Sequence, residues 1–182
     1  MNKKGFVLIE FLIALIIQGT LMLIAIPKST KYIDDSKKDS YVSTVKILGG
    51  NAMNLALGGN LDLYDVDTTY YINTDCLSKE YSYTSPYGDF VKAYIVVTFE
   101  NEGYNYFFTG VDEEGNGVKD LINIRKLDTY DIKSNVSASD ITTDRGIDNR
   151  SKIVIINDKC EKGEPVARTG ANISSTSGEE IE

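Results

Sequence analysis

The stretch that decides the fold is residues 1–27, with the sequence MNKKGFVLIEFLIALIIQGTLMLIAIP. Residues 6–26 are 21 consecutive residues with one charge, that of Glu10, and few other polar interruptions. At about 1.5 Å of rise per residue, such a helix is ~31 Å long, which matches the hydrocarbon core of a bilayer. The pattern therefore predicts a membrane-spanning helix over residues 6–27.

The flanks of this helix predict its orientation and a cleavage point. Lys3 and Lys4 precede the apolar run, and short basic flanks tend to stay in the cytoplasm, so the chain beyond Pro27 is expected outside. A secretory signal would end in a small-residue cleavage site, and none follows the run. The one small residue placed as a processing point is Gly5, at the boundary between the basic leader and the apolar run.

Glu10 is the unusual residue of this stretch. A carboxylate inside a membrane costs about 2.5 to 3.5 kcal/mol on insertion scales, so it needs a partner or a purpose. One interpretation is a glutamate close enough to the interface to stay hydrated. The other is a pair with a cation inside the membrane, which a cut after Gly5 would create as the free amine of Phe6.

Lys3-Lys4-Gly5-Phe6, followed by Glu10 and an apolar run that ends in Pro27, resembles the class III signal and N-terminal helix of type IV pilins and pseudopilins. The resemblance implies that a prepilin peptidase cuts between Gly5 and Phe6 and methylates the new Phe6 amine. It also implies that Glu10 neutralises the Phe6 amine of a neighbouring subunit as a filament grows.

The resemblance covers about 27 of the 182 residues. It implies that Gly19 and Pro27 bracket a stretch that loses helicity in the filament, and the ring of Pro27 predicts a kink there. The sequence departs from the family at Val7, where Thr is more usual, and at Gln18, which is polar in the middle of the run.

Composition limits what the rest of the chain can do. About 150 residues remain after the span, which suffices for one compact domain. The formal charge is −8, with no basic run longer than two residues, so direct nucleic-acid binding is not expected. The chain has no His, which excludes Ser-His-Asp and Cys-His catalysis, and it has no phosphate-binding glycine loop. We therefore expect no enzyme activity and no cofactor.

Cys76 and Cys160 are the two cysteines, and two cysteines in an exported domain usually form a disulfide rather than two free thiols. The bond would close a loop of about 85 residues and stabilise the fold by about 4.5 kcal/mol in the chain-entropy model. In the pilin family a disulfide often fixes the C-terminal region to the sheet.

A second helical stretch and a sheet are predicted beyond Pro27. Apolar residues recur at helical spacing from Tyr41 to Leu55, and glycines 58 and 59 are a good helix stop. Strands are predicted over residues 90–99, 104–111, 118–127 and 152–157, joined by turns. Residues 128–151 lack a period and are expected to form a surface loop. The predicted segments are a leader at 1–5, a transmembrane or filament-core helix at 6–27, an amphipathic half-helix at 28–58, a connection at 59–90, an antiparallel sheet at 91–157, and a disulfide-linked region with a mobile tail at 158–182.

Two features leave alternatives open. Six tyrosines lie in the connection before the first predicted strand, and they either cover the sheet edge or form an adhesive surface. Residues 112–117, DEEGNG, form either a hairpin turn or a calcium site, although the EF-hand pattern is not met. A second acidic cluster is expected to be solvated, so no metal site is assigned. The tyrosines are Tyr64, Tyr70, Tyr71, Tyr81, Tyr83 and Tyr87, and the second cluster comprises Asp140, Thr142, Asp144 and Asp148.

The expected fold is α+β: a long N-terminal helix, half membrane span and half amphipathic, packed on an antiparallel sheet of about four strands. The expected function is a type IV pilin-like structural subunit of a surface filament, with a minor pilin favoured. Its partners would be other pilin subunits, the prepilin peptidase, the pilus assembly machinery and, before assembly, the cytoplasmic membrane. The alternatives are a pseudopilin of a secretion or DNA-uptake system, or an anchored surface domain that does not polymerise.

Overall fold

The computed structural model describes residues 3–59, 61–78, 83–101, 103–147 and 150–168, and it describes no side chains for residues 3–8 and 24–29. The chain divides into two compact units, Met1–Lys38 and Asp39–Glu182. The fold is α+β, with three helices and one six-stranded sheet in the described residues.

Helix α1 runs from Lys3 to Leu57 without interruption, through both Gly19 and Pro27. It ends where the glycines predict, since Gly58 donates a hydrogen bond to the carbonyl of Asn54 at 2.9 Å and Gly59 has a φ of +69°. A left-handed residue just past a helix is a common cap because glycine adopts this conformation without strain. Gly19 has open space around it, with no atom of another residue within 4 Å of where its Cβ would lie.

The predicted membrane span over residues 6–27 is wrong. In the described part of the chain, no helix combines the length and the apolar character needed to cross a membrane. The apolar stretch is also interrupted by the polar side chains of Glu10 and Gln18. The same finding contradicts the localisation that was expected from the span, a single pass through the cytoplasmic membrane followed by a place at the cell surface.

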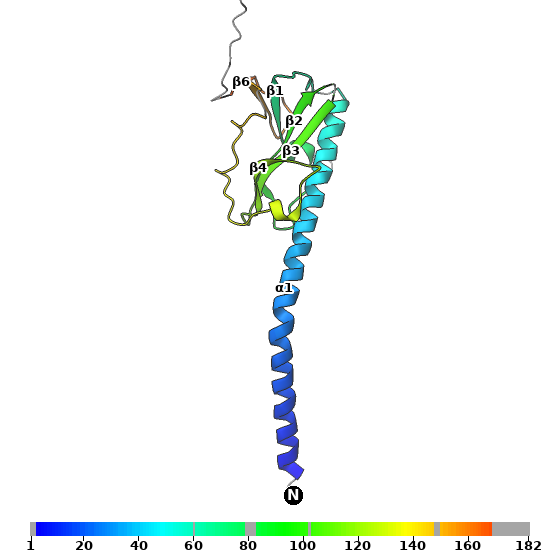
Figure 1. Cartoon of the computed structure of the whole chain (residues 1–182), viewed down its shortest axis with the longest axis vertical. Coiled ribbons are helices and arrows are strands. Elements are labelled where there is room, and N and C mark those ends of the chain that lie inside the picture. The colour runs from blue at the N-terminus through cyan, green and yellow to red at the C-terminus, as the bar shows by residue number, and fades with distance from the viewer. Residues whose placement is uncertain (1–2, 60, 79–82, 102, 148–149, 169–182) are drawn as a thin grey trace, which may run out of the picture. The chain divides into compact units, whose positions relative to one another are not determined.

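The predicted four-stranded antiparallel sheet is also wrong, because the sheet has six strands and is mixed (Figure 1). The strand order is β4-β3-β2-β1-β5-β6. All neighbouring pairs are antiparallel except β1 and β5, which are parallel. The strands are β1 Thr68–Asn73, β2 Phe90–Glu100, β3 Gly103–Asp112, β4 Gly117–Asn123, β5 Lys152–Ile156 and β6 Val166–Ala167.

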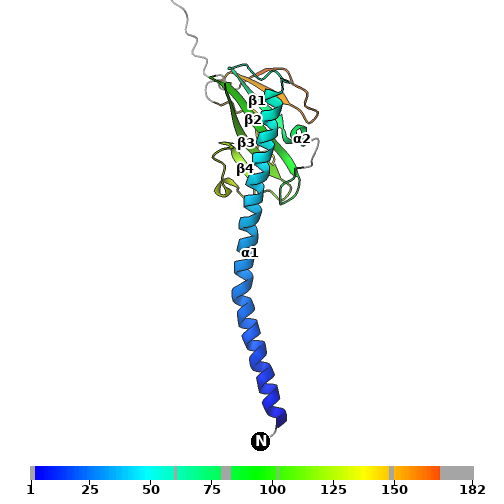
Figure 2. The ribbon, with the colours of Figure 1, turned by 90° about the vertical axis from the view of Figure 1, so that its right-hand side faces the viewer.

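One face of the sheet packs on the amphipathic part of α1 (Figure 2). Tyr41, Val45, Leu48 and Ala52 are completely buried there against residues of β1, β2, β3 and β5. Tyr41 meets Phe90 and Phe108 edge to face, with ring centroids 5.6 and 6.1 Å apart. The helical stripe seen in the sequence is therefore the helix side of the main core.

Part of the segment expected as a surface loop, residues 128–151, covers the opposite face of the sheet instead. Val136 and Ile141 are buried against Val111 of β3, and Ile147 packs on a second cluster around Tyr71. The Tyr71 hydroxyl donates to the carbonyl of Arg145. Among its described residues, this segment contains the 3-10 helix η1, Thr129–Asp131, and no other helix or named strand before β5, so its apolar residues show no period in the sequence.

The Cys76–Cys160 disulfide is present, with the two Cα atoms 5.0 Å apart. Cys76 lies in the short helix α2, Thr74–Leu77, which directly follows β1, and Cys160 lies after β5. The bond therefore joins the segments that follow the two parallel strands, β1 and β5. In the chain-entropy model, a loop of this length contributes about 4.5 kcal/mol to stability.

Candidate assembly surface and surface grooves

The most unusual surface of the chain lies on residues 9–23 of α1. Every side chain in this stretch is exposed, over about four helical turns, and most are apolar. The exposed fractions of the large apolar side chains run from 48% at Leu15 to 76% at Leu23. A helix that is apolar on all sides is normally buried, so this stretch is a candidate surface for contact with other molecules. The large apolar residues are Ile9, Phe11, Leu12, Ile13, Leu15, Ile16, Ile17, Leu21, Met22 and Leu23.

The predicted processing and assembly residues lie on this same helix. Gly5 and Phe6 belong to its first turns, and their side chains fall outside the described ones. Glu10 is exposed and is followed by ten apolar side chains among the next thirteen residues. Among the residues described, no ion pair involves Glu10. The hydroxyl of Thr20 donates to the carbonyl of Ile17 at 2.9 Å, which satisfies this polar group within the helix.

Residues 112–117 form the tight connection between β3 and β4. Asp112 is 2% exposed, and its carboxylate accepts hydrogen bonds from the Ser85 hydroxyl at 2.6 Å and the Asn116 amide at 2.8 Å. Gly115 has a φ of +77°, as this turn requires. The Asp112 carboxylate is thus used to hold the turn and a preceding loop. In the described stretches, no group of three His, Cys, Asp or Glu residues could hold a metal ion.

The second acidic cluster is also held by local contacts. Asp140 pairs with Lys119 at 2.9 Å and accepts a hydrogen bond from the Ser137 amide at 3.0 Å. These contacts lower the pKa of Asp140, and a hydrogen bond from Thr142 lowers the pKa of Asp144. Asp148 lies outside the described residues.

The tyrosines of the predicted connection divide between core and surface. Tyr70 and Tyr71 lie in β1 and are buried, and Tyr87 is buried as well. Tyr64 is 52% exposed and stacks edge to face on Phe99 with centroids 5.9 Å apart. Tyr83 is partly buried against the main core, and Tyr81 lies outside the described residues. The rings therefore mainly cover and build the sheet.

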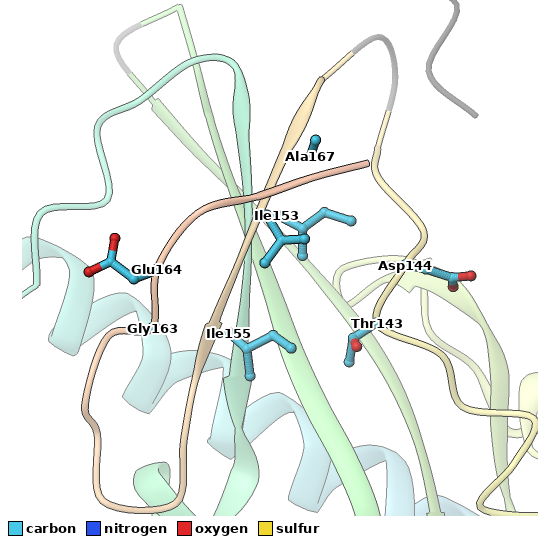
Figure 3. Close-up of a pocket in the computed structure, with 8 residues that line it drawn as sticks. Thr143, Asp144, Ile153, Ile155, Gly163, Glu164 and Ala167 are labelled. Carbon is cyan, nitrogen blue, oxygen red and sulfur yellow. The ribbon is translucent and has the colours of Figure 1, made fainter. Parts of the chain in front are cut away.

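The described residues of the unit 39–182 form surface grooves, among them the β5–β6 pocket and the α1–β3 groove. The β5–β6 pocket, of about 400 Å³, has an apolar floor that includes Ile153 and Ile155 of β5 and Ala167 of β6. Figure 3 shows the carboxylates of Glu164 and Asp144 at its two sides, both directed away from the isoleucines. This pocket offers apolar surface with little polar chemistry.

The α1–β3 groove, of about 550 Å³, lies between α1 and the start of β3. Lys46, Met53 and Leu57 of α1 form one wall, and Tyr104 and Tyr106 of β3 with Arg125 form the other. The hydroxyls of both tyrosines are buried and have no hydrogen-bond partner among the described residues. Burial raises the pKa of Tyr106 to about 12, so its hydroxyl stays protonated and can donate. Sequence patterns did not identify this groove, because its residues come from three segments that only the fold brings together.

Comparison of the chain with protein-family models, curated proteins and solved structures gave no match. The candidate surfaces therefore have to be interpreted from their own chemistry.

Proposed function

We propose that the chain is a type IV pilin-like structural subunit, which is cut between Gly5 and Phe6 and then packs with copies of itself into a filament through the helix of residues 9–23. Residues 3–6 and Glu10 supply the family resemblance. The observation that carries the proposal is that every side chain of this apolar stretch is exposed.

Burial of this stretch between copies would provide the energy for assembly. Burying one large apolar side chain is worth about 1.5 to 3 kcal/mol relative to water, and ten such side chains are exposed on residues 9–23. A helix with apolar residues on every side can contact several neighbours at once. This arrangement suits the interior of a filament better than a two-chain contact on one face.

Glu10 would fix the position of one helix along its neighbour in the filament. Among apolar neighbours, an unpaired carboxylate would be costly, whereas an ion pair limits that cost. The cut after Gly5 creates an amine at Phe6, and methylation leaves it positively charged. The Phe6 amine of a neighbouring copy would then neutralise Glu10 in one relative position of the two helices.

The partners in this proposal are other copies of the subunit, a prepilin peptidase that acts on residues 5 and 6, and an assembly machinery. Gln18 is a second polar residue on the surface to be buried, and it is exposed in the single chain. A subunit present in few copies tolerates such a residue more easily, which favours a minor pilin.

The test is to compare Glu10→Val with the wild type for incorporation into the filament fraction. Removing one partner of a buried ion pair costs about 3 to 5 kcal/mol, so we expect Glu10→Val to lower incorporation more than tenfold, with the amount of chain in the cell unchanged. Asp35→Asn is the matched control, since Asp35 is an exposed acidic residue of α1 outside the apolar stretch. Normal incorporation of Glu10→Val would refute the proposed role.

A further inference from the structure

The α1–β3 groove has a chemistry that the proposed assembly helix does not use. The charged residues among those that line it are Lys46 and Arg125, and both are cationic and exposed. In the described part of the chain, neither forms an ion pair. Two cations thus line one groove of a chain whose formal charge is −8.

The α1 wall of the groove adds apolar surface to these charges. Met53 and Leu57 are 47% and 61% exposed, so apolar area remains available along α1. Gly50 leaves open space beside them, with no atom within 4 Å of where its Cβ would lie. An occupant with carboxylate oxygens and an apolar side chain would satisfy all of these groups.

The length of the groove limits the size of the occupant. Residues 46 and 57 of α1 are eleven positions apart, which corresponds to ~16 Å along the helix. An extended peptide covers this distance with about five residues at ~3.3 Å each. The volume of about 550 Å³ is within the usual range for ligand sites.

We propose that the α1–β3 groove binds residues 178–182, GEEIE, of a second copy of the chain. This segment has five residues, with three carboxylates and one apolar side chain, Ile181. The carboxylates of Glu179, Glu180 and Glu182 would pair with the groove cations, and Ile181 would lie on the apolar surface of Met53 and Leu57. The contact would also offset the charge repulsion between two acidic copies. It does not depend on a cut at Gly5, because the groove lies within residues 39–182.

Carbodiimide cross-linking tests this contact on the full chain, because the reagent joins a lysine amine directly to a carboxylate. Equal amounts of unlabelled and ¹⁵N-labelled chain are mixed in a mild detergent, cross-linked and analysed by mass spectrometry of the peptides. We expect Lys46 to be joined to Glu179, Glu180 or Glu182, with one labelled and one unlabelled peptide in about half of the products, as random pairing of two copies requires.

Variants separate a specific contact from general charge attraction. Arg125→Ala should lower the yield of the Lys46 cross-link about threefold, as expected for the loss of one exposed ion pair. Lys126→Ala is the matched control, since Lys126 is the adjacent exposed cation and does not line the groove, and it should leave the yield unchanged.

Three results would overturn the proposal. One is a cross-link of Lys46 to residues 179–182 in which both peptides always carry the same label, because that contact would lie within one copy. Another is a cross-link of Lys46 to Glu102 in place of the 178–182 segment. The third is an equal loss of yield in Arg125→Ala and Lys126→Ala. An uncut N-terminus would contradict the proposed function and leave these results unaffected.

Discussion

Residues 9–23 and residues 41–56 belong to the same helix, α1, yet their side chains have opposite environments. In the second stretch, Tyr41, Val45, Leu48, Ala52 and Ala56 are completely buried on one face, and residues such as Lys46 and Met53 remain exposed on others. In the first stretch, every side chain is exposed. An apolar stripe on one side of a helix can be buried against the sheet of the same chain. A helix that is apolar on all sides needs further chains to bury it.

The largest expected effect comes from removing the same side chain in each stretch. Leu48→Ala should lower the free energy of unfolding of the folded unit by about 3 kcal/mol, because it leaves a cavity at a fully buried position. Leu15→Ala should leave that free energy unchanged, because Leu15 is 48% exposed. Urea unfolding followed by tyrosine near-UV circular dichroism measures both, since every tyrosine except Tyr32 lies in residues 39–182.

Incorporation into the filament fraction, counted per folded molecule, should show the opposite order. Leu15→Ala should be incorporated less than Leu48→Ala. Leu15→Ala should reduce incorporation, because it removes apolar area from the proposed assembly surface. The comparison between the two stretches fails if Leu15→Ala destabilises the folded unit as much as Leu48→Ala does.

A smaller effect is expected at Asp67, which precedes β1 and accepts two hydrogen bonds from Ser151, one from its amide at 2.8 Å and one from its hydroxyl. These bonds lower the pKa of Asp67 from its ordinary value of 3.8. A lowered pKa in the folded state means that the stabilisation is complete above pH 3.8 and is lost as the pH falls through the lowered pKa. Asp67→Asn should therefore reduce the free energy of unfolding by about 1 to 2 kcal/mol at pH 7 and have little effect in strong acid.

Acid should therefore lower the free energy of unfolding of the unit of residues 39–182 through Asp67, without changing the helix over residues 9–23. Unfolding curves at neutral and acidic pH measure the difference. Asp62→Asn serves as the control, since Asp62 is an exposed acidic residue nearby that accepts the hydrogen bond from Lys162 through its backbone carbonyl. An equal loss in the two variants, or a loss that does not depend on pH, would contradict the role given to Asp67.

The sequence predicted those elements whose patterns reflect local rules. The strand over 90–99 was found because β-branched and aromatic residues are dense there, and it is observed as Phe90–Glu100. The helix end at Leu57 followed from the glycines after it. The three later strand predictions, over 104–111, 118–127 and 152–157, are close to β3, β4 and β5, although β4 already ends at Asn123.

The missed elements depend on contacts between distant segments. Strand β1, TTYYIN, lies between β2 and β5 and is buried on both faces, so no alternation of polar and apolar residues marks it. Its parallel pairing with β5 joins residues about 84 positions apart, as in the pair Tyr71 and Ile155, and made the sheet mixed. Val136, Ile141 and Ile147 cover the second face from a segment without a regular element, so they gave no period to detect.

The candidate site was predicted in part. Glu10 and the apolar run around it were identified from their sequence alone, and the exposure of residues 9–23 supports their role as a contact surface. Lys46 and Arg125 of the α1–β3 groove carry no motif. They became visible only because β4 returns the chain beside α1.

The mass of the N-terminal peptide of the chain isolated from cells tests the central claim most directly. The account predicts a peptide that begins at Phe6 and carries one methyl group on its amine, in the chain recovered from the filament fraction. A peptide that still begins with the leader and contains Lys3 and Lys4 would contradict it.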